Sequence, residues 1–140
     1  MKVFIDTWGW ITLFNKREKR HEEITKWYLD FRQQRGIIHT TDYVLDETFT
    51  LIFRRTSVDI AINAMKKIEE AIEKGYIILD RITSERFDKA KELRLKYRDK
   101  PLISFTDLTS IIVMSEIRID RILTEDEHFK YLETHFQRVP

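Results

Sequence analysis

The feature that most constrains the fold is an alternation, along the whole chain, between short apolar runs and longer amphipathic segments. Short apolar runs are typical of strands buried on both faces of a parallel sheet, whereas apolar residues spaced three or four apart indicate helices. The runs that predict strands are residues 3–5, 37–38, 76–79 and 122–123, with a fifth candidate at 136–139. The segments that predict helices are residues 8–14, 21–35, 42–54, 57–74, 84–98 and 105–118. Strands that alternate with helices imply right-handed crossovers, so we predict one α/β domain whose mostly parallel sheet is covered on both faces.

Two of the predicted helices carry patterns that say how they should pack. The segment 105–118 is apolar almost all round, which places it at the centre of the domain. The segment 57–74 has a one-sided stripe, which predicts a single core-facing side. The members of that stripe are Val58, Ala61, Ile62, Met65, Ile68 and Ile72.

The composition excludes several classes of site. The chain has 140 residues, which suits a single domain, and no cysteine. A disulfide framework, a thiolate zinc site, an iron–sulfur cluster and a cysteine nucleophile are therefore excluded. The three glycines, Gly9, Gly36 and Gly75, are too far apart to build a phosphate-cradling loop, and we expect Gly36 and Gly75 to end helices. No apolar stretch of about 18 residues or signal peptide is found, so we expect a cytoplasmic protein without a membrane span.

Acidic residues follow the predicted strands, at the end of a parallel sheet where ligands bind. Asp6 directly follows the first strand, Asp126 comes shortly after the fourth, and Asp107 begins the central helix. Further acids near these strand ends are Asp42, Asp46, Glu47, Asp80, Glu125 and Glu127. Converging carboxylates repel one another unless a hard cation such as Mg²⁺ or Mn²⁺ lies between them. Such a cation can activate water against a phosphodiester, so the acids indicate a metal-dependent phosphodiesterase.

The charge is unevenly spread although its sum is small. The net charge of +1 argues against generic coating of nucleic acid. Residues 104–128 nevertheless hold six acidic and two basic residues, whereas residues 81–100 hold eight basic and four acidic ones. A nuclease with an acidic pocket also needs cations to hold phosphates. The candidates for RNA binding are Lys16, Arg17, Arg54 and Arg55, which follow the first and third predicted helices.

Four segments in order carry a more specific pattern. They are Val3-Phe4-Ile5-Asp6-Thr7, Tyr43-Val44-Leu45-Asp46-Glu47-Thr48, Ser104-Phe105-Thr106-Asp107 and Leu123-Thr124-Glu125-Asp126-Glu127-His128-Phe129. In order, spacing and length they resemble the four motifs of PIN domains, and most closely those of the VapC-like toxin ribonucleases of type II toxin–antitoxin systems. The resemblance covers nearly the whole chain. It implies a three-layer α/β/α fold with a mostly parallel central sheet of four to five strands.

The resemblance also implies an activity and a site. Residues 1–140 would form a single nuclease domain that cleaves single-stranded RNA. The catalytic, metal-binding acids would be Asp6, Glu47, Asp107 and Asp126, which hold Mg²⁺ or Mn²⁺, with Thr7 and Thr124 as supporting hydroxyls. The implied partners are RNA, a second copy of the chain in a homodimer and a cognate antitoxin protein, but no membrane. Trp8 and Trp10 depart from the family pattern, because smaller residues are frequent there.

Each acid also has a purely structural interpretation. Asp6 could begin a turn and cap the next helix. Glu47 could lie on a solvated face, although its spacing from Val44 places it nearer the apolar stripe than Asp46. Asp107 fits a capping box with Ser104. Asp126 could belong to a solvated acidic turn with its neighbours. For His128, Trp8 and Trp10, a packing or surface role is the default expectation.

Two other functions compete with the nuclease. A phosphoryl-transfer domain would also place an aspartate after the first strand, but a dehalogenase-like phosphatase needs a second aspartate where this chain has Trp8. A receiver domain needs its reactive aspartate after a later strand. The remaining alternative is a catalytically silent PIN-like module that binds RNA or protein.

Overall fold

Five strands form one sheet in the computed structural model, which describes residues 1–131 and 135–140. The elements in chain order are β1 (Lys2–Ile5), α1 (Thr7–Phe14), α2 (His21–Gln33), β2 (Ile37–Thr41), α3 (Asp42–Arg55), α4 (Val58–Glu73), β3 (Ile77–Asp80), α5 (Ser84–Lys96), α6 (Phe105–Ile117), β4 (Arg121–Leu123), α7 (His128–Tyr131) and β5 (Gln137–Arg138). The strand order is β3-β2-β1-β4-β5, and each neighbouring pair is parallel. The predicted α/β class and parallel sheet are confirmed, including the fifth strand.

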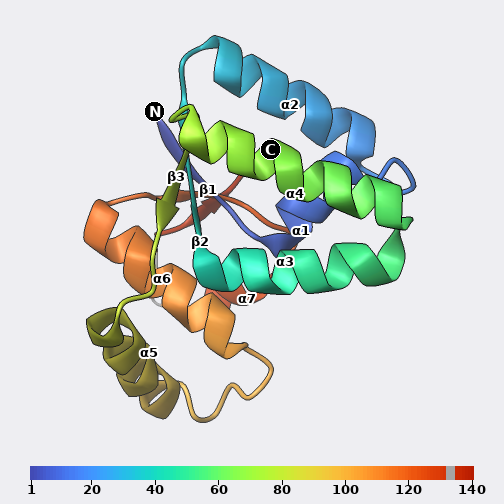
Figure 1. The fold of residues 1–140 in the computed structure, drawn as a ribbon. Helices are drawn as coiled ribbons and strands as arrows, with labels where there is room; N and C mark the ends of the chain where they lie inside the picture. Colours follow the sequence, from blue (N-terminus) through green and yellow to red (C-terminus); the bar gives the residue numbers. More distant parts are fainter. Residues whose placement is uncertain (132–134) are drawn as a thin grey trace.

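Helices cover the sheet on both sides. α1, α2 and α4 lie on one side, whereas α5 and α6 pack side by side on the other (Figure 1). α3 contacts both α1 and α6, so it links the two helical layers. No helix among the described residues is long and apolar enough to cross a membrane.

The centre of the core is made by β1 and α6, as their sequences predict. Val3, Phe4 and Ile5 of β1 are fully buried, because β1 has a neighbouring strand on each side and helices on both faces. On α6, Leu108 and Met114 are also fully buried. Burying a large apolar side chain contributes about 1.5–3 kcal/mol, so this strand and helix fix the position of the loops that follow them.

The stripe of α4 is narrower than its sequence predicts. Ala61 and Ile68 are buried, but Val58 is 60% exposed and Ile62 is 39% exposed. α4 contacts α3 and β3. The small Ala61 and Ala64 allow close approach there, which leaves the flanking apolar residues in solvent.

The two expected helix-ending glycines differ in their reasons for being glycine. Gly75 has a φ of 79°, in the left-handed region that glycine favours, and it ends α4 as predicted. After α2 the left-handed position is taken by Arg35, with a φ of 61°, so the prediction for Gly36 was wrong in detail. Gly36 lies against the Phe31 ring, where an added Cβ would come within 2.2 Å of a ring carbon. Close packing therefore demands the glycine there.

One element was missed. The four-residue helix α7 follows β4 and the acidic turn, in a stretch for which the sequence predicts no element. A single helical turn has too few residues to show a periodic pattern. Its first residue is His128, which places that side chain beside the acidic residues described next.

Candidate active site

The four predicted acids line one pocket of about 300 Å³. Asp6 follows β1 and Asp126 follows β4, and these strands are neighbours in the sheet. Asp107 lies in the first turn of α6, and Glu47 projects from α3. The other described residues that line this acid pocket are Thr7, Trp8, Ile11, Leu51, Arg55, Leu102, Ser104 and Thr124. Elements from three distant parts of the chain thus converge at the carboxyl edge of the sheet.

Thr124 ties the two strand ends together. Its hydroxyl donates a hydrogen bond to Oδ2 of Asp6 at 3.0 Å and accepts one from the backbone N–H of Asp126 at 3.1 Å. The backbone N–H of Asp6 donates to the carbonyl of Leu123 at 3.2 Å. Thr124 is buried, so water does not compete for its hydroxyl. One side chain therefore fixes the relative position of two acids.

Asp107 has both of the roles that the sequence left open. Its backbone N–H donates to Oγ of Ser104 at 3.0 Å, and its Oδ2 accepts from the backbone N–H of Ser104 at 3.4 Å. This is a capping box, and it holds the carboxyl group in a fixed orientation at the start of α6. The same carboxyl group lines the acid pocket. Capping positions the acid and does not remove it from the site.

Glu47 points into the acid pocket, whereas Asp46 is exposed on the other side of α3. This orientation agrees with the helical spacing. Burial raises the pKa of Glu47, whereas Thr7 and the positive charge of Arg55 act to lower it. The Thr7 hydroxyl donates to the carbonyl of Val44 at 3.4 Å, so Thr7 ties the start of α1 to α3, the helix that carries Glu47.

Burial and mutual repulsion favour the protonated forms of Asp6 and Asp107. Burial raises the pKa of Asp6 from 3.8 to about 6, and the charges of Glu47 and Asp126 add to that shift. Burial also raises the pKa of Asp107 to about 8, and Asp6 and Asp126 contribute to it. Raised pKa values mean that the ionised forms of these acids are unfavourable side by side. A cation bound among them would favour the ionised forms. Carboxylate and hydroxyl oxygens are the hard ligands that Mg²⁺ or Mn²⁺ would require.

The structure adds His128, which the sequence argument left outside the site. Its backbone N–H donates to Oδ1 of Asp126 at 2.8 Å, and its ring Nδ1 lies 2.9 Å from the same oxygen. Asp107, Asp126 and His128 each offer a ligand atom, and these three atoms lie within 4.8 Å of one another. In the sequence, only its position two residues after Asp126 could have pointed to His128. The segment that follows is too short to show a helical pattern.

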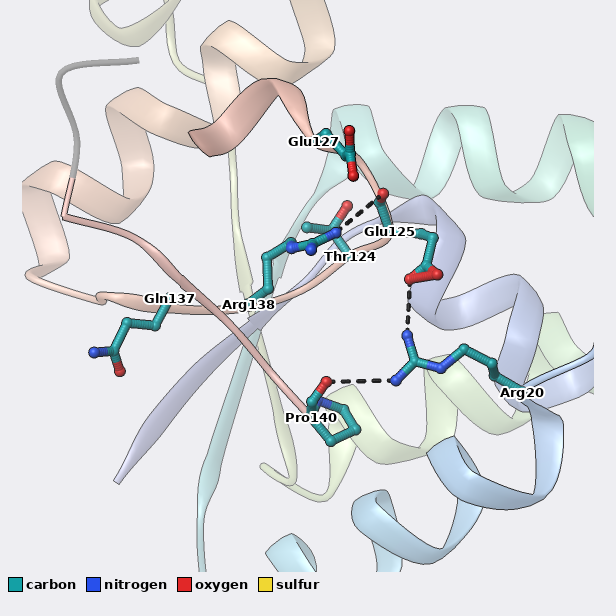
Figure 2. Close-up of a pocket in the computed structure, with 7 residues that line it drawn as sticks. All are labelled: Arg20, Thr124, Glu125, Glu127, Gln137, Arg138 and Pro140. Carbon is teal, nitrogen blue, oxygen red and sulfur yellow. Dashed lines mark hydrogen bonds and ion pairs between the residues drawn. The ribbon is translucent and has the colours of Figure 1, made fainter. Parts of the chain in front are cut away.

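The other acids after β4 belong to a neighbouring hollow of about 760 Å³. Figure 2 shows Glu125 directed at Arg20, whose Nη1 lies 2.8 Å from a Glu125 carboxylate oxygen. Glu127 lines this hollow as well, and Thr124 lines both hollows. Of these three consecutive acids, Asp126 lines the acid pocket, whereas Glu125 and Glu127 line the neighbouring hollow.

The two tryptophans have different places. Trp10 is buried, and its indole N–H donates to Oγ1 of Thr40 at 3.1 Å, as expected for a packing residue. Trp8 is half-buried and lines the acid pocket, with the guanidinium of Arg20 5.4 Å from its ring centre. The larger side chain at position 8 therefore forms part of the wall of the site.

Comparison with protein families identifies the family to which this chain belongs. The family model described as "PIN domain" matches residues 3–134. The chain belongs to the PIN domain family. This confirms the resemblance carried by the four motifs.

Two known proteins resemble this PIN domain over most of their length. The 23S rRNA-specific endonuclease VapC20 of Mycobacterium tuberculosis is 27% identical over 128 residues, which are 91% of each chain. The crystal structure of VapC20, titled a sarcin-ricin loop cleaving toxin, superposes with a TM-score of 0.79, covers 94% of this chain and 95% of its own, and is 25% identical. VapBC2 from Rickettsia felis, bound to a promoter DNA fragment, has a TM-score of 0.70 at 14% identity, with all of each chain covered. The last likeness concerns the fold alone.

Proposed function

We propose that this PIN domain is a metal-dependent endoribonuclease and the toxin of a toxin–antitoxin pair. Residues 1–140 would act as a single nuclease domain. The observation that carries the proposal is the convergence of four carboxyl groups, from four separate elements, in one pocket. The likeness to VapC20, a named endonuclease, favours RNA as the substrate.

In this proposal Asp6, Glu47, Asp107 and Asp126 hold one or two Mg²⁺ or Mn²⁺ ions, and His128 lies close enough to join them. A bound divalent cation supplies a water of lowered pKa and offsets the charge of the phosphodiester transition state. The protein contributes rigid placement of its acids. Thr124 fixes Asp6 relative to Asp126, the capping box fixes Asp107, and Thr7 supports Glu47. No protein nucleophile is required.

Further proposals concern the partners of this chain. VapC20 is named as a 23S rRNA-specific endonuclease and as a toxin, which supports an RNA substrate and a toxin role here. For this chain we propose an RNA substrate, a cognate antitoxin and a homodimer in the cytoplasm. The alternative is a catalytically silent PIN-like module, which would retain the fold without binding a divalent cation.

The test compares Glu47→Gln with Asp46→Asn. Both changes remove one negative charge from adjacent residues of α3, but only Glu47 lines the acid pocket. We expect Mg²⁺-dependent cleavage of single-stranded RNA to fall more than about 100-fold in Glu47→Gln, as for the loss of a metal ligand, and to stay within twofold or so in Asp46→Asn. Equal activities of the two variants would refute the assigned site. Calorimetry with Mn²⁺ separates the alternative, because a silent module would give no heat of binding.

A further inference from the structure

A further hollow beside the acid pocket, distinct from the one that contains Glu125 and Glu127, has a volume of about 660 Å³. Four basic residues converge in it. We call it the basic groove. Its described lining residues are Phe14, Asn15, Lys16, Arg17, Arg54, Arg55, Thr56, Ser57, Ile60 and Asn63. The four basic residues come from positions nearly forty apart in the chain. They are the cations that the sequence singled out for RNA binding.

Helix packing brings these two basic pairs together. α1 ends at Phe14, and Lys16 and Arg17 follow at once, while Arg54 and Arg55 form the last turn of α3. α1 packs against α3, so the ends of the two helices lie side by side. The loop after α1 is held in place, because Asn15 donates its backbone N–H to Ile11 at 2.8 Å and accepts one from Arg17 at 3.1 Å. The groove therefore has a hydrogen-bonded backbone beneath exposed basic side chains.

The groove has no counter-charge of its own. Among the described residues, none of its four basic side chains forms an ion pair or a side-chain hydrogen bond, and no acid lines the groove. Arg20, a few residues further on, is different, because Glu23 and Glu125 both bind its guanidinium. Four exposed cations, of which only Arg55 lies near an acid, attract a polyanion, and the release of its counterions favours binding.

The groove adjoins the acid pocket at one shared residue. Arg55 lines both hollows, and its positive charge acts on Glu47. The groove also contains the half-buried ring of Phe14 and the side chain of Ile60, which is 42% exposed. A positive channel with apolar surface beside it is the usual arrangement for a single-stranded nucleic acid.

We propose that the basic groove binds the sugar–phosphate backbone of single-stranded RNA on one side of the cleaved bond, with Arg55 at the junction between groove and acid pocket. The inference rests on the proposed nuclease function and adds an extended binding site to it. Lys16, Arg17 and Arg54 contact phosphates remote from the reacting one. They are positioning residues, since they do not line the acid pocket. Their contribution is to the capture of long substrates.

The first test measures RNA binding in the presence of a chelator, where metal-dependent cleavage cannot occur. The variant Lys16→Ala/Arg54→Ala removes one cation from each side of the groove. The control Lys66→Ala/Lys74→Ala removes two exposed cations of α4 and its C-cap that do not line the groove, and Lys74 lies about 16 Å by helix rise from Asn63, the nearest α4 residue of the groove. We expect the groove variant to bind a labelled oligonucleotide of about ten residues roughly tenfold more weakly. The slope of log affinity against log salt should fall by about 1.4, for two lost phosphate contacts, and should not change in the control.

The second test compares cleavage of that oligonucleotide with cleavage of a dinucleotide, which is too short to fill both hollows. The groove variant should lose kcat/KM on the oligonucleotide and keep its activity on the dinucleotide. Equal losses on both substrates, or equal binding by the groove variant and the control, would overturn the proposal. Tighter binding of a polyglutamate peptide than of RNA would also overturn it, in favour of an acidic protein partner. If the wild-type protein cleaves neither substrate, the proposed nuclease function fails, but the binding comparison still decides whether the groove holds RNA.

Discussion

The acid pocket and the basic groove lie side by side, and each brings together side chains of one charge. They differ in burial. The acids are drawn from four elements into partial or full burial, where repulsion and desolvation raise the pKa values of Asp6 and Asp107. The cations of the groove are exposed at helix ends, where water screens their repulsion. The buried acids therefore lower the stability of the fold unless a small cation binds among them. The exposed cations lower it little, so they remain available to bind a long polyanion. The difference in burial separates the proposed metal-binding site from the proposed RNA-binding surface.

Asp107→Asn should show the largest effect, and in two directions. Cleavage should fall more than about 100-fold, because a charged ligand is lost. The metal-free protein should become more stable by about 1 kcal/mol, on the order of 4 °C in Tm, because repulsion from Asp6 and Asp126 is relieved. The asparagine oxygen can still accept from the Ser104 backbone, so the capping box survives. Thermal melts in chelator and cleavage assays measure the two effects.

The control for that variant is Ser104→Ala, which removes the capping hydroxyl but no charge. It should lower stability by about 1 kcal/mol, opposite in sign to Asp107→Asn. A loss of stability in both variants would mean that Asp107 matters only as a cap.

Thr124→Val should have an intermediate effect. The change keeps the shape of the side chain but removes the hydroxyl that links Asp6 to the Asp126 backbone. Residues that orient metal ligands commonly contribute 10- to 100-fold in metal affinity, so we expect Mn²⁺ binding and cleavage to weaken by that order. Isothermal titration with Mn²⁺ measures the change directly. Thr124→Ser, which restores the hydroxyl, should recover most of the affinity, and a Ser variant as weak as Val would contradict the linking role.

Much of this arrangement could be predicted from local sequence, because strand ends and helix periods are local properties. The buried run of β1 places Asp6, and the period of α3 separates Glu47 from Asp46. Asp107 needed the structure, because a capping box and a metal-binding acid have the same sequence pattern. His128 was missed because the single turn of α7 has no period of its own.

The basic groove shows a different limit of sequence analysis. The sequence shows that its two pairs of residues are basic. Charged residues in a loop are ordinarily only solvated, so the pairs alone do not indicate a binding site. Their convergence depends on the packing of α1 against α3, which no short motif encodes. The exposure of Val58 and Ile62 has the same origin, since α4 packs through its alanines and leaves its wider apolar stripe uncovered. Tertiary packing decides which side of an amphipathic helix is buried.

A further prediction concerns pH and separates the two clusters without mutation. Asp6 and Asp107 have folded-state pKa values of about 6 and about 8, above the ordinary value of 3.8. A group whose pKa is raised by folding stabilises the protein while it is protonated and loses that contribution as pH rises through the folded pKa. The metal-free protein should therefore lose stability between about pH 4 and about pH 8, by about 1 kcal/mol or more. Saturating Mn²⁺ should flatten the upper part of this curve, because the cation stabilises the ionised acids. Lys16→Ala/Arg54→Ala should leave the curve unchanged, since neither side chain lines the acid pocket. A metal-free protein whose Tm is constant or rises between about pH 5 and about pH 8 would show that the acids are not held together in solution as they are in the structure.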